Sequence, residues 1–361
     1  SAAEREAAGG DVLHMEVGQP STPAPKRVLE AAARALPRQT LGYTLALGMP
    51  ELRAAIARHY RTRFGLDVPA ERIVVTSGSS GAFILAFLAA FDAGDRVALT
   101  EPGYPCYRNI LNALGVETPV ISVVGEASFR LDARRLAGLP GPIHGVLVAS
   151  PANPTGTMLD RAALQGLADF CEQREAWLIV DEIYHGITYE RPADSILALT
   201  QGAIVINSFS KYFSMTGWRL GWMVLPEKLV RTVERLAQNL FISPPAISQV
   251  AALAAFDAYD ELDANVARYA KNRALLLNEL PAAGLDRLAP ADGAFYIYAD
   301  VSRFTNDADQ FCRRMLAEIG VAATPGIDFD RALGNHFVRF SFAGATADMA
   351  EAARRLKTWV K

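Results

Sequence analysis

The sequence predicts an α/β protein with two lobes, a large domain with a mostly parallel seven-stranded sheet between helices and a smaller α+β domain. Three observations support this class. The chain has 361 residues, enough for two lobes. Between residues 72 and 260, short apolar runs alternate with helical segments, which is typical of a parallel sheet. One long helical segment then leads into a shorter mixture of strands and helices.

The expected elements follow this plan in order. Residues 1–40 contain a proline-rich turn and a helix at 27–36, and we expect this segment to pack with the small domain. A helix at 50–64 opens the large domain, 41–260. Its strands are expected at 72–76, 96–100, 118–123, 145–149, 177–180, 203–207 and 221–225, with helices at 81–91, 107–114, 161–175 and 227–238. A bridging helix is expected at 260–280, where the small domain, 261–361, begins. The rest of that domain is expected to contain strands at 293–300 and 336–343 and a helix at 307–319.

Composition excludes several classes of partner. The net charge of −3 gives no reason to expect binding to nucleic acid or to an anionic membrane. The apolar run 82–91 is too short to span a bilayer. Three widely spaced cysteines fit neither a disulfide framework nor a metal site. The residues from Ser1 to Arg5 are charged and unlike a signal peptide, so we expect a cytoplasmic protein.

Lys211 is the most informative residue. It follows the apolar run 203–207, where burial would lower its pKa and leave a neutral, nucleophilic amine. Ser208, Ser210 and Arg219 supply donors suited to a phosphate. A lysine nucleophile beside a phosphate site suggests pyridoxal 5'-phosphate (PLP), an aldehyde that carries a phosphate. The alternative is a loop lysine whose methylenes cover apolar surface.

A second anion site is expected where the first strand runs into the small-residue turn 76–82. Such a turn presents free backbone N–H groups at a helix N-terminus, together with the hydroxyls of Ser79 and Ser80. It matches neither the Walker loop nor the dinucleotide fingerprint. A tight turn without a ligand is the alternative.

Further polar and aromatic residues stand where strands end, and ligands bind at that edge of a parallel sheet. Tyr104 could stack on a flat ring, and Asn153 could donate to an oxygen of such a ring. Asp181 closes an apolar run and needs a cationic partner, for which a protonated pyridine nitrogen would serve, and Tyr184 adds a phenol. Tyr104 could instead be a packed loop tyrosine, and Asn153 could simply form an Asx turn.

Arg339 lies in an otherwise apolar strand and needs a carboxylate, either from a substrate or from an internal salt bridge. Gly18, in the proline-rich turn, could bring its backbone close to a ligand or simply form a turn. Tyr43 stands between glycines and resembles a surface cap.

Together these features resemble the class I and II PLP-dependent aminotransferases of fold type I, which include the aspartate aminotransferases. The resemblance covers nearly the whole chain and is most specific at 150–156, 181–184 and 208–211 with Arg219. It implies that Lys211 holds PLP covalently and then transfers protons, that Asp181 pairs with the pyridine nitrogen, and that Asn153 and Tyr184 bind the ring oxygen. The phosphate would lie among Ser79, Ser80, Ser208, Ser210 and Arg219.

The resemblance also implies that Tyr104 stacks on the ring and that Arg339, with the Gly18 backbone, binds the substrate carboxylate. Tyr43 would reach the phosphate of a partner subunit, which makes the active unit a homodimer with shared sites. The implied reaction moves an amino group between an amino acid and a 2-oxo acid. A PLP-dependent lyase or synthase on the same scaffold, and a non-catalytic ligand-sensing domain, remain alternatives.

Substrate preference is expected from the stretch 237–243. Aspartate-specific relatives use a second arginine, from the partner subunit, to bind the side-chain carboxylate, whereas in this chain Gln238 falls at about that position among apolar residues. A neutral amide cannot balance a buried carboxylate. We therefore expect apolar or aromatic amino acids to react at least as fast as aspartate.

Overall fold

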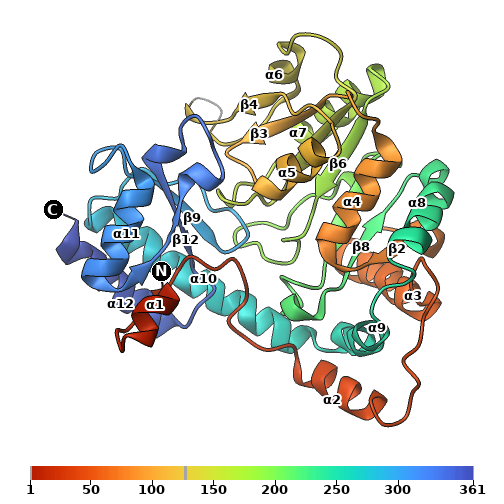
Figure 1. The fold of residues 1–361 in the computed structure, drawn as a ribbon, viewed down its shortest axis with the longest axis horizontal. Coiled ribbons are helices and arrows are strands. Elements are labelled where there is room, and N and C mark those ends of the chain that lie inside the picture. Colours follow the sequence, from red (N-terminus) through yellow and green to blue (C-terminus); the bar gives the residue numbers. More distant parts are fainter. Residues whose placement is uncertain (1, 126–127, 361) are drawn as a thin grey trace.

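The computed structural model describes residues 2–125 and 128–360, and it has two lobes joined by a long helix (Figure 1). The large lobe contains a seven-stranded sheet in the order β2-β8-β7-β6-β5-β3-β4, in which only β8 runs antiparallel to its neighbours. The strands are β2 (Ile73–Thr76), β3 (Val97–Glu101), β4 (Val120–Ser122), β5 (Gly145–Ala149), β6 (Trp177–Asp181), β7 (Ile204–Ser208) and β8 (Gly221–Val224). The seven-stranded, mostly parallel sheet predicted from the sequence is confirmed.

These strands are apolar throughout because both faces of the sheet are buried. Side chains alternate along each strand, so Val205 packs into one core while Ile204 and Ile206 pack into the other. The core that contains Ile204 lies under α4 (Gly78–Ala90), α5 (Pro105–Ala113) and α8 (Glu227–Leu240). The opposite core receives α3 (Pro50–His59), α7 (Arg161–Gln173) and α9 (Ala246–Leu253). A short helix, α6 (Ala133–Ala137), packs against α7.

Two helix boundaries differ from the prediction in an informative way. Helix α4 begins at Gly78 rather than at residue 81, so Ser79 and Ser80 lie in its first turn and not in a preceding loop. The expected helix 50–64 ends as an α-helix at His59 and continues as a single π-helical turn, Tyr60–Phe64, which closes at Gly65 in the left-handed region. Glycine adopts that conformation without the steric cost of a Cβ atom.

The small lobe is built on a three-stranded antiparallel sheet in the order β11-β12-β9. Its strands are β9 (Tyr296–Asp300), β11 (Thr324–Pro325) and β12 (Phe337–Ser341), and its helices are α11 (Ala308–Ile319) and α12 (Thr346–Trp359). Helix α10 (Tyr259–Ala282) runs from the large lobe to α12 (Figure 1). The expected bridging helix therefore forms, although the sequence prediction did not include α12.

The N-terminal segment contacts both lobes. Helix α1 (Ala2–Ala7) is tied to α11 by the Arg5 guanidinium, and β1 (Leu13–His14) pairs in parallel with β10 (Val321–Ala322). Helix α2 (Lys26–Ala35), in contrast, packs against α9 of the large lobe. The turn at 16–20 thus lies between the lobes. Residues 1 and 361, at the ends of the expected domains, lie outside the described residues.

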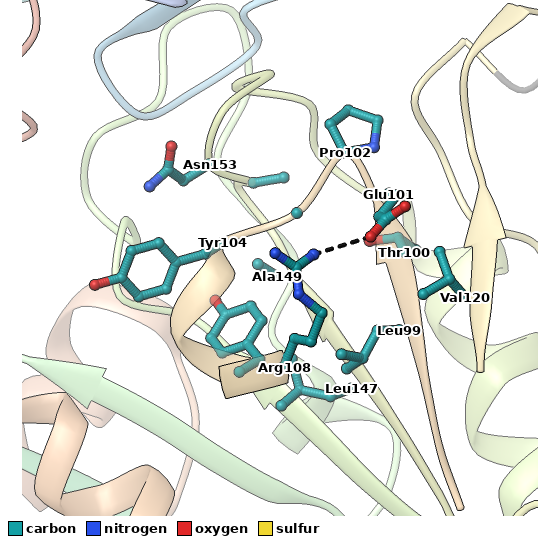
Figure 2. Close-up of a pocket in the computed structure, with 13 residues that line it drawn as sticks. Leu99, Thr100, Glu101, Pro102, Tyr104, Arg108, Val120, Leu147, Ala149 and Asn153 are labelled. Carbon is teal, nitrogen blue, oxygen red and sulfur yellow. Dashed lines mark hydrogen bonds and ion pairs between the residues drawn. The ribbon is translucent and has the colours of Figure 1, made fainter. Parts of the chain in front are cut away.

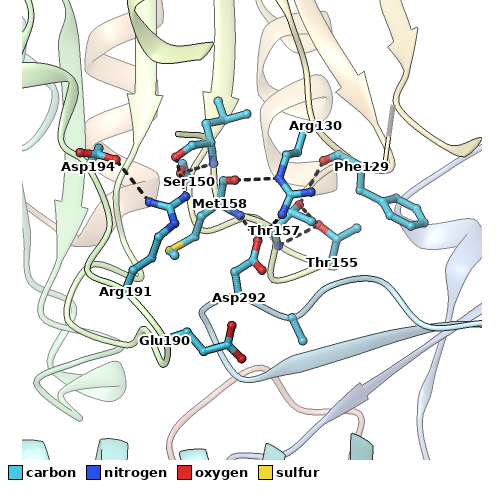
Figure 3. Close-up of polar contacts among 12 residues, drawn as sticks. Phe129, Arg130, Ser150, Thr155, Thr157, Met158, Glu190, Arg191, Asp194 and Asp292 are labelled. Carbon is cyan, nitrogen blue, oxygen red and sulfur yellow. Dashed lines mark hydrogen bonds and ion pairs between the residues drawn. The ribbon is translucent and has the colours of Figure 1, made fainter. Parts of the chain in front are cut away.

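A polar contact joins the lobes beside the turn 150–158 (Figure 3). The Asp292 carboxylate accepts a hydrogen bond from Arg130 at 2.7 Å and another from the Met158 backbone N–H at 3.0 Å. The Arg130 Nε atom also donates to the Met158 carbonyl at 3.1 Å. The backbone N–H of Gly293 donates to the Gly156 carbonyl at 2.8 Å, so the segment before β9 fixes the turn that carries Asn153.

We expect Asp292→Ala to lower the free energy of unfolding by about 1–3 kcal/mol, because it removes one charge-assisted hydrogen bond and leaves a backbone donor without its partner. Urea denaturation measures this change. The matched control is Asp286→Ala, which breaks an exposed pair with Arg303 and should change stability by less than about 0.5 kcal/mol. Equal effects in the two variants would contradict a structural role for Asp292.

Candidate active site

A cavity of about 330 Å³ opens where the parallel strands end, within the size range of small-molecule sites. Asp181 is the last residue of β6, and Lys211 follows β7 by three residues. Tyr104 and Asn153 come from the loops after β3 and β5, and the small lobe contributes Tyr296 and Arg339. The other lining residues are Gly18, Ser79, Ser80, Phe83, Tyr107, Ile183, Tyr184, Ser210, Thr216 and Arg219.

Lys211 is half-buried, and its Nζ atom donates to the Gly18 carbonyl at 2.5 Å. Burial, and after it the positive charge of Arg339, lower the pKa of this amine to about 8, while the negative charge of Asp181 acts in the opposite direction. Within the described residues no carboxylate lies within 4.0 Å of Nζ. The amine therefore loses its proton more readily than an ordinary lysine, as a nucleophile requires.

Asp181 is buried, and both of its oxygens accept hydrogen bonds. Oδ1 accepts from the Ile183 backbone N–H at 3.0 Å, and Oδ2 accepts from the Tyr107 hydroxyl. Burial raises the pKa of Asp181 to about 6, and these two hydrogen bonds oppose the rise. At neutral pH the group is mainly a carboxylate, which is suited to a cationic ligand atom.

The start of α4 forms an anion site. Ser77 precedes the helix without capping it through its side chain, so the first N–H groups stay available to a ligand. The Arg219 guanidinium lies over this turn, and a Cβ atom on Gly78 would come within 2.6 Å of it. Only glycine leaves room for this approach. Backbone donors, the Ser79 and Ser80 hydroxyls and a guanidinium together fit a phosphate.

Arg339 is buried and is held by uncharged groups. It donates to Asn153 Oδ1 at 2.9 Å and to the Glu16 carbonyl at 2.6 Å, and its Cζ atom lies 4.4 Å from the centroid of the Tyr296 ring. Its Nε atom is buried without a hydrogen-bond partner among the described residues. No carboxylate of the described chain lies within 4.0 Å, so the internal salt bridge considered above does not form in this part of the chain. The guanidinium is suited to a carboxylate from outside.

Asn153, Tyr184 and Tyr296 line one side of the cavity. The Asn153 oxygen is taken by Arg339, so its amide nitrogen is the donor left for a ligand. The Tyr184 and Tyr296 hydroxyls lie 2.8 Å apart. A Cβ atom on Gly18 would meet the Tyr296 hydroxyl at 2.4 Å, which explains a glycine at that position.

Tyr104 lines the main cavity and also a smaller one, whose lining residues are drawn in Figure 2. Behind Tyr104, Arg108 pairs with Glu101 at 2.9 Å, and Arg331 of the small lobe reaches the same carboxylate at 3.2 Å. The Gly103 N–H also donates to the Phe329 carbonyl at 3.0 Å. These contacts fix the loop that presents the Tyr104 ring.

Two residues predicted from the sequence lie away from the cavity wall. Ser208 is buried, and its hydroxyl lies within hydrogen-bonding distance of Ser210 Oγ and the Leu220 carbonyl, so it shapes the loop before Lys211. Tyr43 is 83% exposed and does not line the cavity of its own subunit. The other predicted site residues line one cavity: Gly18, Ser79, Ser80, Tyr104, Asn153, Asp181, Tyr184, Ser210, Lys211, Arg219 and Arg339.

Sequence reasoning missed Tyr107 and Tyr296. Tyr107 lies three residues after Tyr104, one helical turn further along α5, and that spacing could have suggested it. Tyr296 begins β9, where strand alternation places it on the same face as Tyr298. The alternation alone does not show which face of β9 lines the cavity, so it could not identify Tyr296.

The fold and the site define a class of α/β proteins in which an anion site, a lysine of lowered pKa and a buried carboxylate surround one cavity at the carboxyl edge of the sheet. Comparison with known proteins then gives the family. The family model for aminotransferase class I and II matches residues 10–356, and the chain belongs to this family.

Two solved structures and a curated protein are close to it. A valine–pyruvate aminotransferase of Mycobacterium tuberculosis is 52% identical over 100% of this chain and 94% of its own length. A crystal structure described as a putative aminotransferase from Silicibacter pomeroyi has a TM-score of 0.94 at 52% identity, covering 99% and 94% of the two chains. The aspartate aminotransferase of Thermus thermophilus with maleate has a TM-score of 0.92 at 32% identity, covering 99% and 94%.

The chain is therefore an aminotransferase that acts on an amino acid and a 2-oxo acid, and its cofactor is PLP. The lyase and sensor alternatives give way to this assignment. The described residues fit the cofactor, because a phosphate site, a half-buried lysine and a buried carboxylate lie around one cavity. No helix in residues 2–125 and 128–360 combines the length and apolar character needed to cross a membrane.

We expect apoenzyme to capture PLP covalently at a rate that rises as the pH passes about 8, because only the neutral amine attacks an aldehyde. Stopped-flow absorbance measures this rate. Lys211→Ala serves as the control and should show only slow, reversible association. A rate that stays flat between pH about 7 and about 9 would contradict the lowered pKa.

Proposed function

We propose that this aminotransferase exchanges the amino group of a small apolar amino acid, with valine and alanine as the leading candidates, with a 2-oxo acid such as pyruvate. The observation that carries this proposal is the charge of the cavity wall. Its cations are Lys211, Arg219 and Arg339. In this proposal Lys211 and Arg219 are needed for the cofactor aldehyde and phosphate, and Arg339 is needed for the α-carboxylate that every substrate carries. Among the described lining residues no further cation remains for a side-chain carboxylate.

In this proposal the residues around the cavity bind the cofactor and move the proton. PLP, when bound, supplies an electron sink that makes the substrate Cα–H acidic. Lys211 holds the cofactor and then moves the proton at Cα, and Asp181 keeps the ring nitrogen protonated. Arg219 and the first turn of α4 bind the phosphate, with the hydroxyls of Ser79, Ser80 and Ser210. Asn153 and Tyr184 bind the ring oxygen, and Tyr104 stacks on the ring.

Arg339 binds the substrate α-carboxylate. Its free Nε atom and the Asn153 amide give the planar, directional donors that a carboxylate requires. Tyr296 lies against the guanidinium and holds its plane. The backbone of Gly18 lies at the same edge, which places the reacting carbon near Lys211.

The stretch 237–243 is proposed to favour an apolar substrate, because Gln238 falls at about the position of the arginine that aspartate-specific relatives supply from the partner subunit. Gln238 is exposed on α8 and does not line the cavity of its own subunit, so it would act across the proposed dimer interface. Leu240 and Ile242 beside it are exposed. The relative at 52% identity is named a valine–pyruvate aminotransferase, whereas aspartate aminotransferases such as that of Sulfurisphaera tokodaii are 32% identical.

We expect valine, alanine, leucine, phenylalanine or tyrosine to convert the PLP form at least as fast as aspartate does. An uncompensated side-chain carboxylate would lose its hydration in this cavity. Single-turnover absorbance with each amino acid measures the rates. A large preference for aspartate would show that a cation reaches the cavity from another part of the protein.

A gain-of-function variant tests whether the lack of a cation is what disfavours aspartate. Gln238→Arg should raise the rate with aspartate relative to valine by about tenfold or more, because it supplies the missing cation. Asn239→Arg adds the same charge one residue along α8 and should leave the ratio unchanged. Equal changes in both variants would indicate general electrostatic steering rather than a side-chain site.

We also propose a homodimer with shared sites. Several large apolar side chains are exposed on packed neighbouring segments, and we call these the apolar face: Tyr43, Leu45, Leu88, Leu240 and Ile242. The Thr44 N–H donates to Ser243 Oγ, and α4 packs on α8, which brings these segments together. Exposed apolar clusters of this kind are typical of protein interfaces. Tyr43, 83% exposed, is free to reach a neighbouring phosphate site.

Mixing a Tyr43 variant with a Lys211 variant should restore activity, because each mixed dimer contains one site with both groups intact. Activity is measured after subunit exchange, which differently tagged subunits confirm. Self-mixtures of each variant are the controls and should stay inactive. Exchange without recovered activity would contradict shared sites.

The proposed location is the cytoplasm. Cys106, Cys171 and Cys312 are all free thiols, and Cys171 and Cys312 are buried. Free thiols persist in a reducing compartment.

A further inference from the structure

Tyr107 is buried and directs its hydroxyl at Asp181, although neither the sequence motifs nor the proposed roles include it. Helix α5 begins at Pro105, so Tyr104 and Tyr107 lie one turn apart and both face the cavity. Their rings meet edge to face with centroids 5.4 Å apart, and Phe83 packs on the other side at 4.9 Å. The ring of Tyr107 is therefore fixed, and its hydroxyl has one direction.

Asp181 needs that hydroxyl because it is buried at the end of β6. The Ile183 backbone N–H satisfies Oδ1 at 3.0 Å, and Tyr107 satisfies Oδ2. Each carboxylate oxygen has room for a second hydrogen bond. The two internal donors thus fix the plane of the carboxylate and leave acceptor capacity for a donor in the cavity.

The charged and titratable groups around Asp181 come from several elements. Lys211 stabilises its charge, and the adjacent Glu182 opposes it. Tyr104, Tyr184 and Cys106 also lie near enough to interact with it electrostatically. Burial and the Asp181 charge raise the pKa of Tyr107 well above its usual value, so this phenol remains a donor across the working pH range.

We infer that Tyr107 is a positioning residue that keeps the Asp181 carboxylate ionised and aimed into the cavity, where it can pair with the protonated ring nitrogen of PLP. This inference rests on the role proposed for Asp181. The competing account is that Tyr107 only packs α5 against the sheet. Phenylalanine at this position separates the two, because it keeps the ring and removes the hydroxyl.

The test measures the affinity of apoenzyme for PLP as a function of pH. Tyr107→Phe should weaken binding about tenfold or more near neutral pH, the usual cost of losing a hydrogen bond to a buried charge. Binding weakens at low pH because protonated Asp181 cannot balance the ring charge. Without the Tyr107 donor the pKa of Asp181 rises, so this acid limb should move to higher pH by about one unit.

Tyr298→Phe is the matched control, because it removes a buried tyrosine hydroxyl that has no hydrogen-bond partner among the described residues. It should bind PLP as the wild type does. Thermal melting of both variants checks that the fold is retained. If Tyr107→Phe binds PLP with unchanged affinity and its pH profile keeps the same acid limb, the inference is overturned and only the packing account remains.

A double-mutant cycle with Asp181→Asn shows whether Tyr107 acts through Asp181. The loss caused by Tyr107→Phe should be much smaller when Asp181→Asn is already present, since the charge that the hydroxyl supports is then gone. An equal loss with and without Asp181→Asn would also overturn the inference. If Asp181→Asn alone leaves PLP affinity unchanged, the proposed role of Asp181 fails instead, which is a separate outcome.

Discussion

An excess of positive charge around one cavity governs this structure. Lys211, Arg219 and Arg339 share one cavity wall, and Asp181 is the only carboxylate among the described lining residues. Arg339 is buried and Lys211 is half-buried, and a cation without a counter-ion is costly where water is excluded. The lowered pKa of Lys211 reflects both its burial and its proximity to Arg339. A phosphate near Arg219 and a substrate carboxylate at Arg339 would relieve that excess. The cavity is thus arranged to be completed by two anions.

The scaffold maintains this arrangement by supplying uncharged partners. Backbone carbonyls of the segment between β1 and α2 accept from the cations, Gly18 from Lys211 and Glu16 from Arg339. These contacts satisfy donors without neutralising the charge, so the cations remain available to ligands. Because that segment also pairs with the small lobe through β1, the position of the small lobe bears directly on the site.

Much of the fold was predictable because its signals are local. Strands buried on both faces read as continuous apolar runs, and all seven lie within two residues of their expected limits. The sequence prediction placed the start of α4 too late because glycine and serine favour turns. No local pattern shows the close approach of Arg219 to Gly78, because it is a tertiary contact.

The site was predictable where a residue type is unusual in its local setting, as with Lys211 after an apolar strand or Arg339 within one. Tyr107 and Tyr296 were missed because aromatic residues in a core segment are ordinary, and only the folded chain brings their hydroxyls to Asp181 and Tyr184. Ser208 looked like a phosphate ligand from its spacing, yet its side chain turns toward Ser210 and Leu220. Side-chain direction in a loop depends on contacts that sequence spacing does not encode.

The central claim is that Lys211 is the residue that carries the cofactor, and chemical trapping tests it most directly. PLP-loaded protein is treated with borohydride, which makes the link permanent, and is then digested and mapped by mass spectrometry. The account predicts a single modified peptide with the pyridoxyl phosphate group on Lys211. Modification of another lysine, or protein that releases all of its PLP on denaturation after borohydride treatment, would contradict it.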